Sequence, residues 1–236
     1  AHELLDTCGL PGEIWAAVDG SALEPPDLAS ETSSTLFEPA YPFKLKAGEI
    51  GCFMSHRQIW AEMVRRGLDH ALVLEDDVSL DPELFPKALA LAVRNVATYG
   101  YVQLQNRPAK GPARLIDQEG RCRLTVPVVA PVRASAQLIS QKAAVRLLKH
   151  AQRFDRPVDT YVQSHWHTGL RPAVIYPAGV STISDTLDGS TIQTGRKTMR
   201  ERLWREVARF FYRRRLARFS RQSGAPIPDD AGEIRQ

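Results

Sequence analysis

Residues 47–80, AGEIGCFMSHRQIWAEMVRRGLDHALVLEDDVSL, join a helical pattern to an apolar strand that runs straight into three acids. Apolar side chains recur on one face of the predicted helix, and a glycine ends it: Ile50, Phe53, Trp60, Val64 and then Gly67. The next run, ALVL at 71–74, predicts a buried strand. This helix and strand establish an alternating α/β pattern for the chain.

The three acids after the strand, Glu75, Asp76 and Asp77, repel one another, so their clustering needs an explanation. Side chains alternate between the two faces of a strand, which predicts that Glu75 and Asp77 share one side. Two carboxylates on one side suit a hard cation, Mg²⁺ or Mn²⁺, shared with substrate phosphates. The structural alternative is an acidic turn after a strand.

The rest of the chain continues the alternation of strands and helices. We expect strands at 13–20, 101–105, within 113–139 and at 171–177. Helices are expected at 81–96, where Asp81 would be the N-cap, and at 141–152 and 157–169. Residues 21–46 read as a long loop. This order predicts an α/β fold with a mixed, mainly parallel sheet, helices on both faces, and ligands bound beyond the strand C-terminal ends.

Length and composition limit the classes of protein to which the chain can belong. The 236 residues can bury a sizeable core, and no apolar run approaches the ~18 residues that would span a membrane. Three scattered cysteines, Cys8, Cys52 and Cys122, favour free thiols in a reducing compartment. The net charge of +4 is uneven, because residues 196–221 hold 11 basic and 2 acidic residues while residues 1–195 are mildly acidic.

The run at 48–77 resembles glycosyltransferase family 25, which includes bacterial lipooligosaccharide galactosyltransferases and animal collagen galactosyltransferases. The resemblance rests on Gly48 to Cys52, Ser55-His56, Ile59-Trp60 and Glu75 to Asp77, and on AVDG at 17–20, FDRPVD at 154–159 and SDTLDGSTI at 184–192. The VINL-type first strand of the family, which helps to hold the donor nucleotide, is not found. We expect either that the native N-terminus lies upstream of the given chain or that the protein has lost part of its donor site.

The resemblance implies a GT-A fold, a nucleotide-sugar donor (typically UDP-galactose), Mn²⁺ or Mg²⁺, and inversion to a β-linked product on a lipooligosaccharide or other glycan. Two alternatives stay open: a catalytically inactive nucleotide-sugar-binding protein of the same fold, and a sugar nucleotidyltransferase that releases pyrophosphate.

The candidate site residues follow from the motifs. Glu75 and Asp77 are the predicted metal residues, with Asp77 as the direct ligand and Glu75 or Asp76 for water-mediated or ribose contacts. The other predicted donor contacts are Asp19, Gly48, Glu49, Gly51, Ser55, His56, Asp185 and Ser190. The small residues on the helix let a ligand or a backbone approach closely, and the alternative for Glu49 and His56 is a satisfied polar group on a packed helix.

Asp159 is the candidate base for the acceptor hydroxyl, because its position at a helix start would keep the carboxylate ionised. An ordinary first-turn acid is the alternative. His165 and His167 fall on opposite sides of a helix, so at most one of them could complete a metal shell.

We expect a catalytic domain at 1–195 and a basic helical tail with a disordered end at 196–236. Met199, Leu203, Val207, Phe210 and Phe211 form an apolar stripe among arginines. This pattern favours an anionic membrane surface, with docking on the protein's own body or nucleic-acid contact as alternatives; no specific nucleic acid is expected. The expected location is the cytoplasm, peripheral on the inner face of a bacterial inner membrane.

Overall fold

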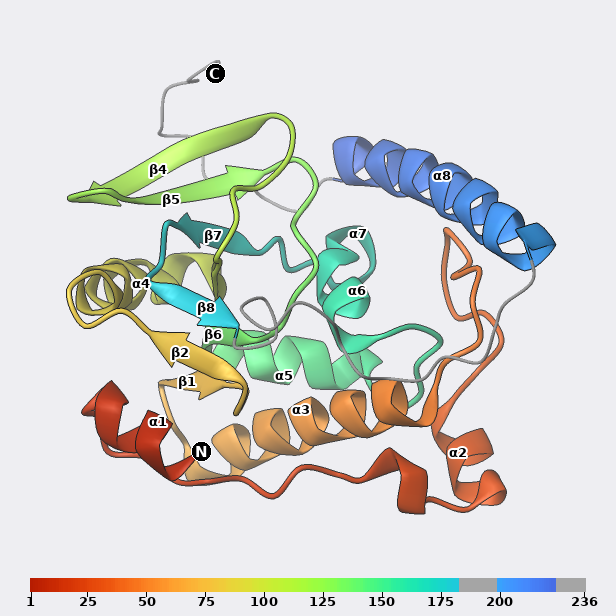
Figure 1. Ribbon diagram of the computed structural model, residues 1–236, viewed down its shortest axis with the longest axis horizontal. Helices are drawn as coiled ribbons and strands as arrows, with labels where there is room; N and C mark the ends of the chain where they lie inside the picture. The colour runs from red at the N-terminus through yellow and green to blue at the C-terminus, as the bar shows by residue number, and fades with distance from the viewer. Residues whose placement is uncertain (183–198, 224–236) are drawn as a thin grey trace.

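A computed structural model of the chain describes residues 1–182 and 199–223 (Figure 1). Its main sheet has six strands in the order β1-β6-β3-β7-β5-β4. The strands are β1 His70–Leu74, β3 Tyr101–Leu104, β4 Ala113–Glu119, β5 Cys122–Pro127, β6 Ala136–Ser140 and β7 Ala173–Tyr176. Only the pair β3 and β7 is parallel, and the other four pairs are antiparallel.

The sheet is therefore mixed but mostly antiparallel, and the prediction of a mainly parallel sheet was wrong. β1 and β3 run in the same direction, as an alternating strand–helix order requires, but β6 lies between them and pairs antiparallel with both. The β4–β5 hairpin then adds two antiparallel pairs at the far edge. Whether a pair is parallel or antiparallel depends on which strands are adjacent in the sheet. The strands formed within and just after residues 113–139, β4, β5 and β6, supply the antiparallel partners.

Helices cover both faces of the sheet, as predicted (Figure 1). One face carries α3 Ala47–Arg66, α5 Gln141–His150 and α6 Val158–Gln163, whose core includes Phe53, Trp60 and Ile139. The other face carries α4 Phe85–Tyr99 and α1 His2–Cys8, around Leu91, Val102 and Leu124. Because strand side chains alternate, neighbouring residues such as Val102 and Tyr101 enter the two different cores.

Smaller elements differ from the sequence pattern. Residues 13–19 form no strand, and the loop at 21–46 contains a 3₁₀ turn, Gly20–Ala22, and a short helix α2 Pro25–Glu31. A separate two-stranded sheet, β2 Val78–Leu80 with β8 Val180–Thr182, was not predicted. The helix expected at 157–169 is split at Ser164 into α6 and α7 His165–Thr168.

The segment at 13–20, expected to form a strand, instead crosses the start of α3 at residues 18–20. The backbone N–H of Val18 donates to Ser55 Oγ (2.8 Å), and the Ser55 hydroxyl donates to Gly51 O (2.8 Å). A methyl group on Gly51 would overlap the carbonyl of Val18 and lie 2.7 Å from the nitrogen of Gly20. Gly51 and Ser55 therefore admit a protein backbone.

The basic C-terminal segment forms one helix, α8 Met199–Gln222, which packs beside α7 (Figure 1). Leu216 is buried, Arg171 Nη2 donates to Ser220 O (3.1 Å), and the rings of Trp166 and Phe219 lie 5.7 Å apart. One face of α8 is thus docked on the rest of the protein. The sequence pattern allowed this docking as an alternative to membrane binding. Among the described helices, none combines the length and apolarity needed to cross a bilayer.

We expect Gly51→Ala to lower the free energy of unfolding by about 1–3 kcal/mol, because the added methyl group collides with backbone that cannot rotate away. Gly48→Ala is the matched control, since a Cβ there meets nothing within 4 Å and alanine favours a helix by about 1 kcal/mol. Urea denaturation of both variants measures the difference. Equal stability of the two variants would mean that residues 18–20 do not lie tightly on α3.

Candidate active site

A pocket of about 480 Å³ opens where the start of α3, the end of β1 and the start of α6 meet. Its wall contains Tyr41, Gly48, Glu49, Cys52, Glu75, residues 132–135 and residues 157–160. The structure therefore brings together four of the residues predicted from sequence: Gly48, Glu49, Glu75 and Asp159. These come from segments up to 111 positions apart, which is why sequence spacing alone could not group them.

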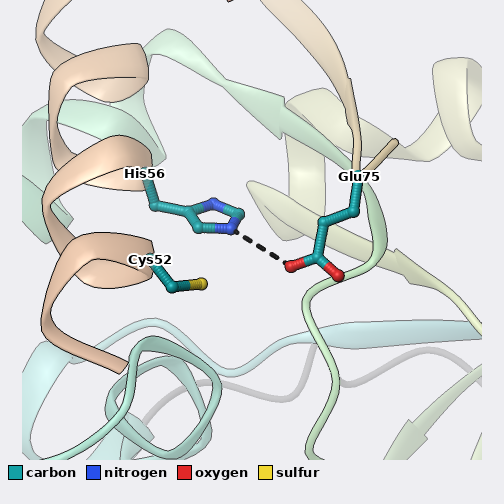
Figure 2. Close-up of side chains that lie close together, drawn as sticks. All are labelled: Cys52, His56 and Glu75. Atoms are coloured by element: carbon teal, nitrogen blue, oxygen red, sulfur yellow. Dashed lines mark ion pairs between the residues drawn. The ribbon is translucent and has the colours of Figure 1, made fainter. Parts of the chain in front are cut away.

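Glu75 is the acid that the pocket exposes after β1. Its backbone N–H donates to Ser135 O (2.8 Å), which fixes the residue at the strand end. His56 Nε2 lies 3.8 Å from Glu75 Oε1, and this imidazole lowers the pKa of the Glu75 carboxyl below its usual range. Figure 2 shows His56 on α3 facing Glu75 across the site. Glu75 is thus held in its ionised, cation-binding form.

His56 itself is buried and oriented by its second nitrogen. The amide of Gln137 lies 3.4 Å from His56 Nδ1 and donates to it, which leaves Nε2–H as the donor that faces Glu75. His56 does not line the pocket, so the structure places it behind Glu75 rather than against a donor.

Cys52 lies one turn before His56 and completes a cluster with Glu75 (Figure 2). One ligand atom from each of the three residues lies within 4.8 Å of the other two. Burial raises the pKa of the Cys52 thiol to about 12, and Glu75, Asp159 and Glu49 add to that shift. The thiol is therefore protonated at neutral pH, and its raised pKa reports the negative charge gathered in the pocket.

Asp159 is in the first turn of α6, and its Oδ1 accepts hydrogen bonds from the backbone N–H of Thr160 (2.6 Å) and from Thr160 Oγ1 (3.1 Å). Burial raises the pKa of the Asp159 carboxyl; the Thr160 hydrogen bonds oppose the shift, and Glu49 and Glu75 increase it. The expectation that the helix start would keep this acid readily ionised was wrong in direction. A helix of six residues has too small a dipole to outweigh burial beside two other carboxylates.

Glu49 combines a wall position with a local structural role. Its Oε2 accepts a hydrogen bond from the backbone N–H of Lys46 (2.8 Å) at the start of α3. This contact leaves the carboxylate at the pocket edge and also satisfies one of the donors that a helix start leaves open.

Several predicted residues do not line the pocket. Asp19 is exposed and accepts hydrogen bonds from Ser21 N (2.9 Å) and Ser21 Oγ (2.6 Å). β1 ends at Leu74, so strand alternation does not apply to the three acids, and Asp76 and Asp77 lie in the turn that follows. Only Glu75 of the three lines the wall. Asp185 and Ser190 lie outside the described residues.

The two candidate histidines on α7 also lie away from the pocket wall. His165 is fully buried, and the ring of His167 stacks on Phe37 with centroids 3.7 Å apart. Burial lowers the pKa of each imidazole to about 4. They act as neutral packing groups, which does not support a histidine ligand from this helix.

Residues 2–111 match the sequence model of "Glycosyltransferase family 25 (LPS biosynthesis protein)". A "Glycosyltransferase 25 family member" of Drosophila melanogaster is 30% identical over 219 residues, which cover 81% of this chain and 36% of that protein. The chain belongs to glycosyltransferase family 25.

Other relatives match the family 25 chain over shorter stretches. Human "Procollagen galactosyltransferase 2" is 39% identical over 84 residues, covering 34% of this chain and 13% of the human protein. The bovine "Probable inactive glycosyltransferase 25 family member 3" is 39% identical over 77 residues, covering 30% of this chain and 13% of that protein. The match to the Drosophila relative covers 81% of this chain but only 36% of the relative. The chain therefore spans about a third of the length of that protein.

A solved crystal structure, that of mannose-1-phosphate geranyltransferase from Thermus thermophilus, aligns with a TM-score of 0.30 and 18% identity, over 59% of this chain and 51% of that chain. A similarity this low carries no weight for the fold or the site of the family 25 chain. The family match, by contrast, includes Glu75 and the pocket residues of α3 but ends before Asp159.

The pocket of the family 25 chain is also lined by residues that the sequence did not single out as site candidates, among them Tyr41, Cys52 and Arg133. Cys52 had a signal, because it precedes His56 by four positions on the same helix face. Arg133 has a positive φ of 125°, unusual for a residue with a side chain, and its Nη1 donates to Asn106 Oδ1 (2.9 Å). Such backbone strain clusters at functional sites but leaves no mark in the sequence.

We expect Asp159→Asn to leave the chain as stable as the wild type, or more stable, at pH 8. A raised pKa in the folded state means that ionisation of Asp159 opposes folding above the unfolded pKa, and asparagine removes that charge. The stability difference should shrink as the pH is lowered through the raised pKa of Asp159, because the wild-type carboxyl then takes up its proton. Thermal denaturation at pH 8 and at a series of lower pH values measures this.

Asp81→Asn is the control for that measurement. The carboxylate of Asp81 accepts hydrogen bonds from Glu83 N and Leu84 N (both 2.9 Å), and these hold its pKa below the usual range. Its substitution should bring no gain at pH 8. A clear loss of stability in Asp159→Asn at pH 8 would show that the Thr160 contacts outweigh the burial of charge.

Proposed function

We propose that this chain carries the catalytic centre of an inverting glycosyltransferase that moves a hexose, galactose from UDP-galactose, to a hydroxyl of a glycan acceptor with a β linkage. The observation that carries the proposal is the pocket itself, which is lined both by Glu75, just after β1, and by Asp159, in the first turn of α6. A mixed sheet covered on both faces, with a pocket at a strand end, also supports a GT-A type of nucleotide-sugar fold.

Asp159 has the properties of the base in this reaction. Its carboxylate accepts the proton of the acceptor hydroxyl while the acceptor oxygen attacks the anomeric carbon from the side opposite the leaving group. The bond from the anomeric carbon to the phosphate oxygen breaks, and UDP leaves with the electron pair. A raised pKa makes the ionised Asp159 a stronger base than an exposed aspartate.

The pocket residues fit a divalent cation beside a diphosphate. Glu49 and Glu75 bring carboxylates to the pocket lining, and oxygen is the ligand type that Mn²⁺ and Mg²⁺ prefer. When bound, such an ion would neutralise charge that develops on the leaving diphosphate. Glu75 is the proposed ligand on the wall and Asp77, in the following turn, the second; a soft-ligand site at Cys52 and His56 is less suited to these ions.

Arg133 gives the same pocket a positive side chain. It lies on the wall in a strained backbone conformation, held by its contact with Asn106. A guanidinium at that place suits a diphosphate, because its N–H groups match the geometry of phosphate oxygens. We assign Arg133 to donor binding.

The acceptor is proposed to be a lipooligosaccharide or another lipid-linked glycan, and the protein to work at the cytoplasmic face of a bacterial inner membrane. The description of the family model supports the acceptor class, and the names of the collagen-modifying relatives support galactose. A catalytically inactive nucleotide-sugar-binding protein is the second candidate, because one similar relative is named as inactive.

We expect the full-length protein with Mn²⁺ to transfer galactose from UDP-galactose to a glycan acceptor, and Asp159→Asn to lower kcat by roughly 10²–10⁴ with donor affinity little changed. Glu83→Gln, an exposed acid outside the pocket, is the control. A panel of donors and acceptors, read by labelled-sugar transfer, measures this. UDP binding without turnover would favour the inactive protein, and pyrophosphate release from UTP would favour a nucleotidyltransferase.

The metal assignment has its own test. We expect Glu75→Gln and Asp77→Asn each to weaken Mn²⁺ binding in the presence of UDP by about tenfold or more, since each would remove an anionic ligand. Electron paramagnetic resonance of free Mn²⁺ measures binding without turnover, and Glu83→Gln again serves as control. If only Glu75→Gln weakens binding, Asp77 is not a ligand; if neither does, the ion is held elsewhere.

A further inference from the structure

Helix α8 carries apolar side chains on two opposite faces. The inner face packs on the body: Leu216 is buried, Phe219 contacts Trp166, and Tyr212 lies edge-on to Tyr41 with ring centroids 5.6 Å apart. Docking on the body already buries the inner apolar face of α8. The second face of α8 therefore needs its own explanation.

The outer face is strongly exposed. Met199, Leu203, Phe210 and Phe211 expose 81, 69, 53 and 60% of their surface, and Val207 exposes 47%. We call this set the outer stripe. No large hydrophobic side chain elsewhere in the described ranges 1–182 and 199–223 is as exposed as Met199 or Leu203. Within the described part of the chain, nothing covers this stripe, and contiguous apolar surface of this kind marks an interaction site.

Arginines extend the outer stripe along the helix. At 3.6 residues per turn, Arg214 and Arg221 fall in line with Leu203, and Arg200 and Arg218 lie beside them. All four are exposed. The outer face thus presents apolar side chains over its first three turns and positive charge along its whole length. A partner that binds this face must provide both an apolar region for these side chains and negative charge for the arginines.

We propose that the outer face of α8 binds the surface of an anionic lipid bilayer. An anionic bilayer satisfies both requirements, because aromatic and aliphatic side chains enter the acyl boundary while arginines contact lipid phosphates. A second copy of the chain fits poorly, since α8 holds nine arginines against two glutamates and two such helices would repel. A nucleic acid would use the charge but would leave the aliphatic residues in water.

The docked face connects this surface to the pocket. Arg215 Nη2 donates to Glu38 Oε2 (2.6 Å), and Trp204 lies edge-on to Phe43 with centroids 6.2 Å apart. The segment between these two contacts contains Tyr41, which lines the pocket. A bilayer bound to the outer face would therefore lie about 10 Å, the width of one helix, from the segment that contains Tyr41. Bilayer binding itself does not depend on the proposed transfer reaction.

The test is co-sedimentation of the full chain with vesicles of phosphatidylcholine containing phosphatidylglycerol, compared with phosphatidylcholine alone. Two variants probe the two parts of the face: Phe210→Ser with Phe211→Ser, and Arg214→Glu with Arg218→Glu. Matched controls on other exposed helix faces are Val93→Ser with Val145→Ser, and Lys142→Glu with Lys149→Glu. Thermal denaturation by circular dichroism checks that every variant is folded.

We expect the wild type and both controls to sediment with anionic vesicles, to bind neutral vesicles poorly and to dissociate at high salt. Each outer-face variant should bind anionic vesicles about tenfold more weakly, or worse, because it removes membrane-facing apolar area or reverses two charges. Binding that is unchanged in both variants, or equal for neutral and anionic vesicles, would overturn the proposal. So would tighter binding to an oligonucleotide, or a dimer in sedimentation velocity that the serine variant abolishes while vesicles fail to bind.

Discussion

A buried ion pair between two neighbouring residues, Asp155 and Arg156, holds together the segments that make the pocket. Arg156 donates to both carboxylate oxygens of Asp155 (2.7 and 3.0 Å), and neither side chain is more than 1% exposed. The same guanidinium donates to Phe37 O (2.8 Å) and lies 3.6 Å from the centre of the Phe37 ring. Its third nitrogen reaches Tyr212 of α8 at 3.5 Å. In comparable sites, loss of one partner leaves an uncompensated buried charge and costs about 3–5 kcal/mol.

This pair explains why distant parts of the chain reach the pocket in one arrangement. Asp155 also accepts from the backbone N–H of Leu36 (2.9 Å), so the loop that carries Tyr41 is fixed to the residues just before α6. Asp159 lies in the first turn of α6, three residues after Arg156, so the pair fixes the chain directly before the helix that carries it. α8 joins the same network through Tyr212 and Arg215. The loop, the candidate base and the basic helix are therefore mechanically connected, although they come from three separate parts of the sequence.

The pocket concentrates negative charge at a cost to the folded state. Three acidic residues and a cysteine line the pocket, and burial raises the pKa values of Asp159 and Cys52, so their ionised forms are disfavoured there. Glu75 differs from these two, because its neighbour His56 keeps it ionised. A site tuned for stability alone would replace these acids. Their presence is consistent with a polyvalent cation and a charged donor that complete the site when bound.

The sequence by itself determined the local units and the family. The helix at 47–66, the strand at 70–74 and the basic helix at 199–222 follow from periodicity, glycine stops and composition, which act over a few residues. It also supplied Glu75 and Asp159 as candidates. Only the tertiary structure decided that the sheet is mostly antiparallel, because pairing depends on which strands β6 lies between. It likewise placed Gly51 and Ser55 under a crossing backbone, put His56 behind Glu75 and raised the pKa of Asp159. Burial and the approach of residues from different segments, 19 positions apart for His56 and Glu75 and 110 for Glu49 and Asp159, set those outcomes. Neither is encoded in the spacing of any single motif.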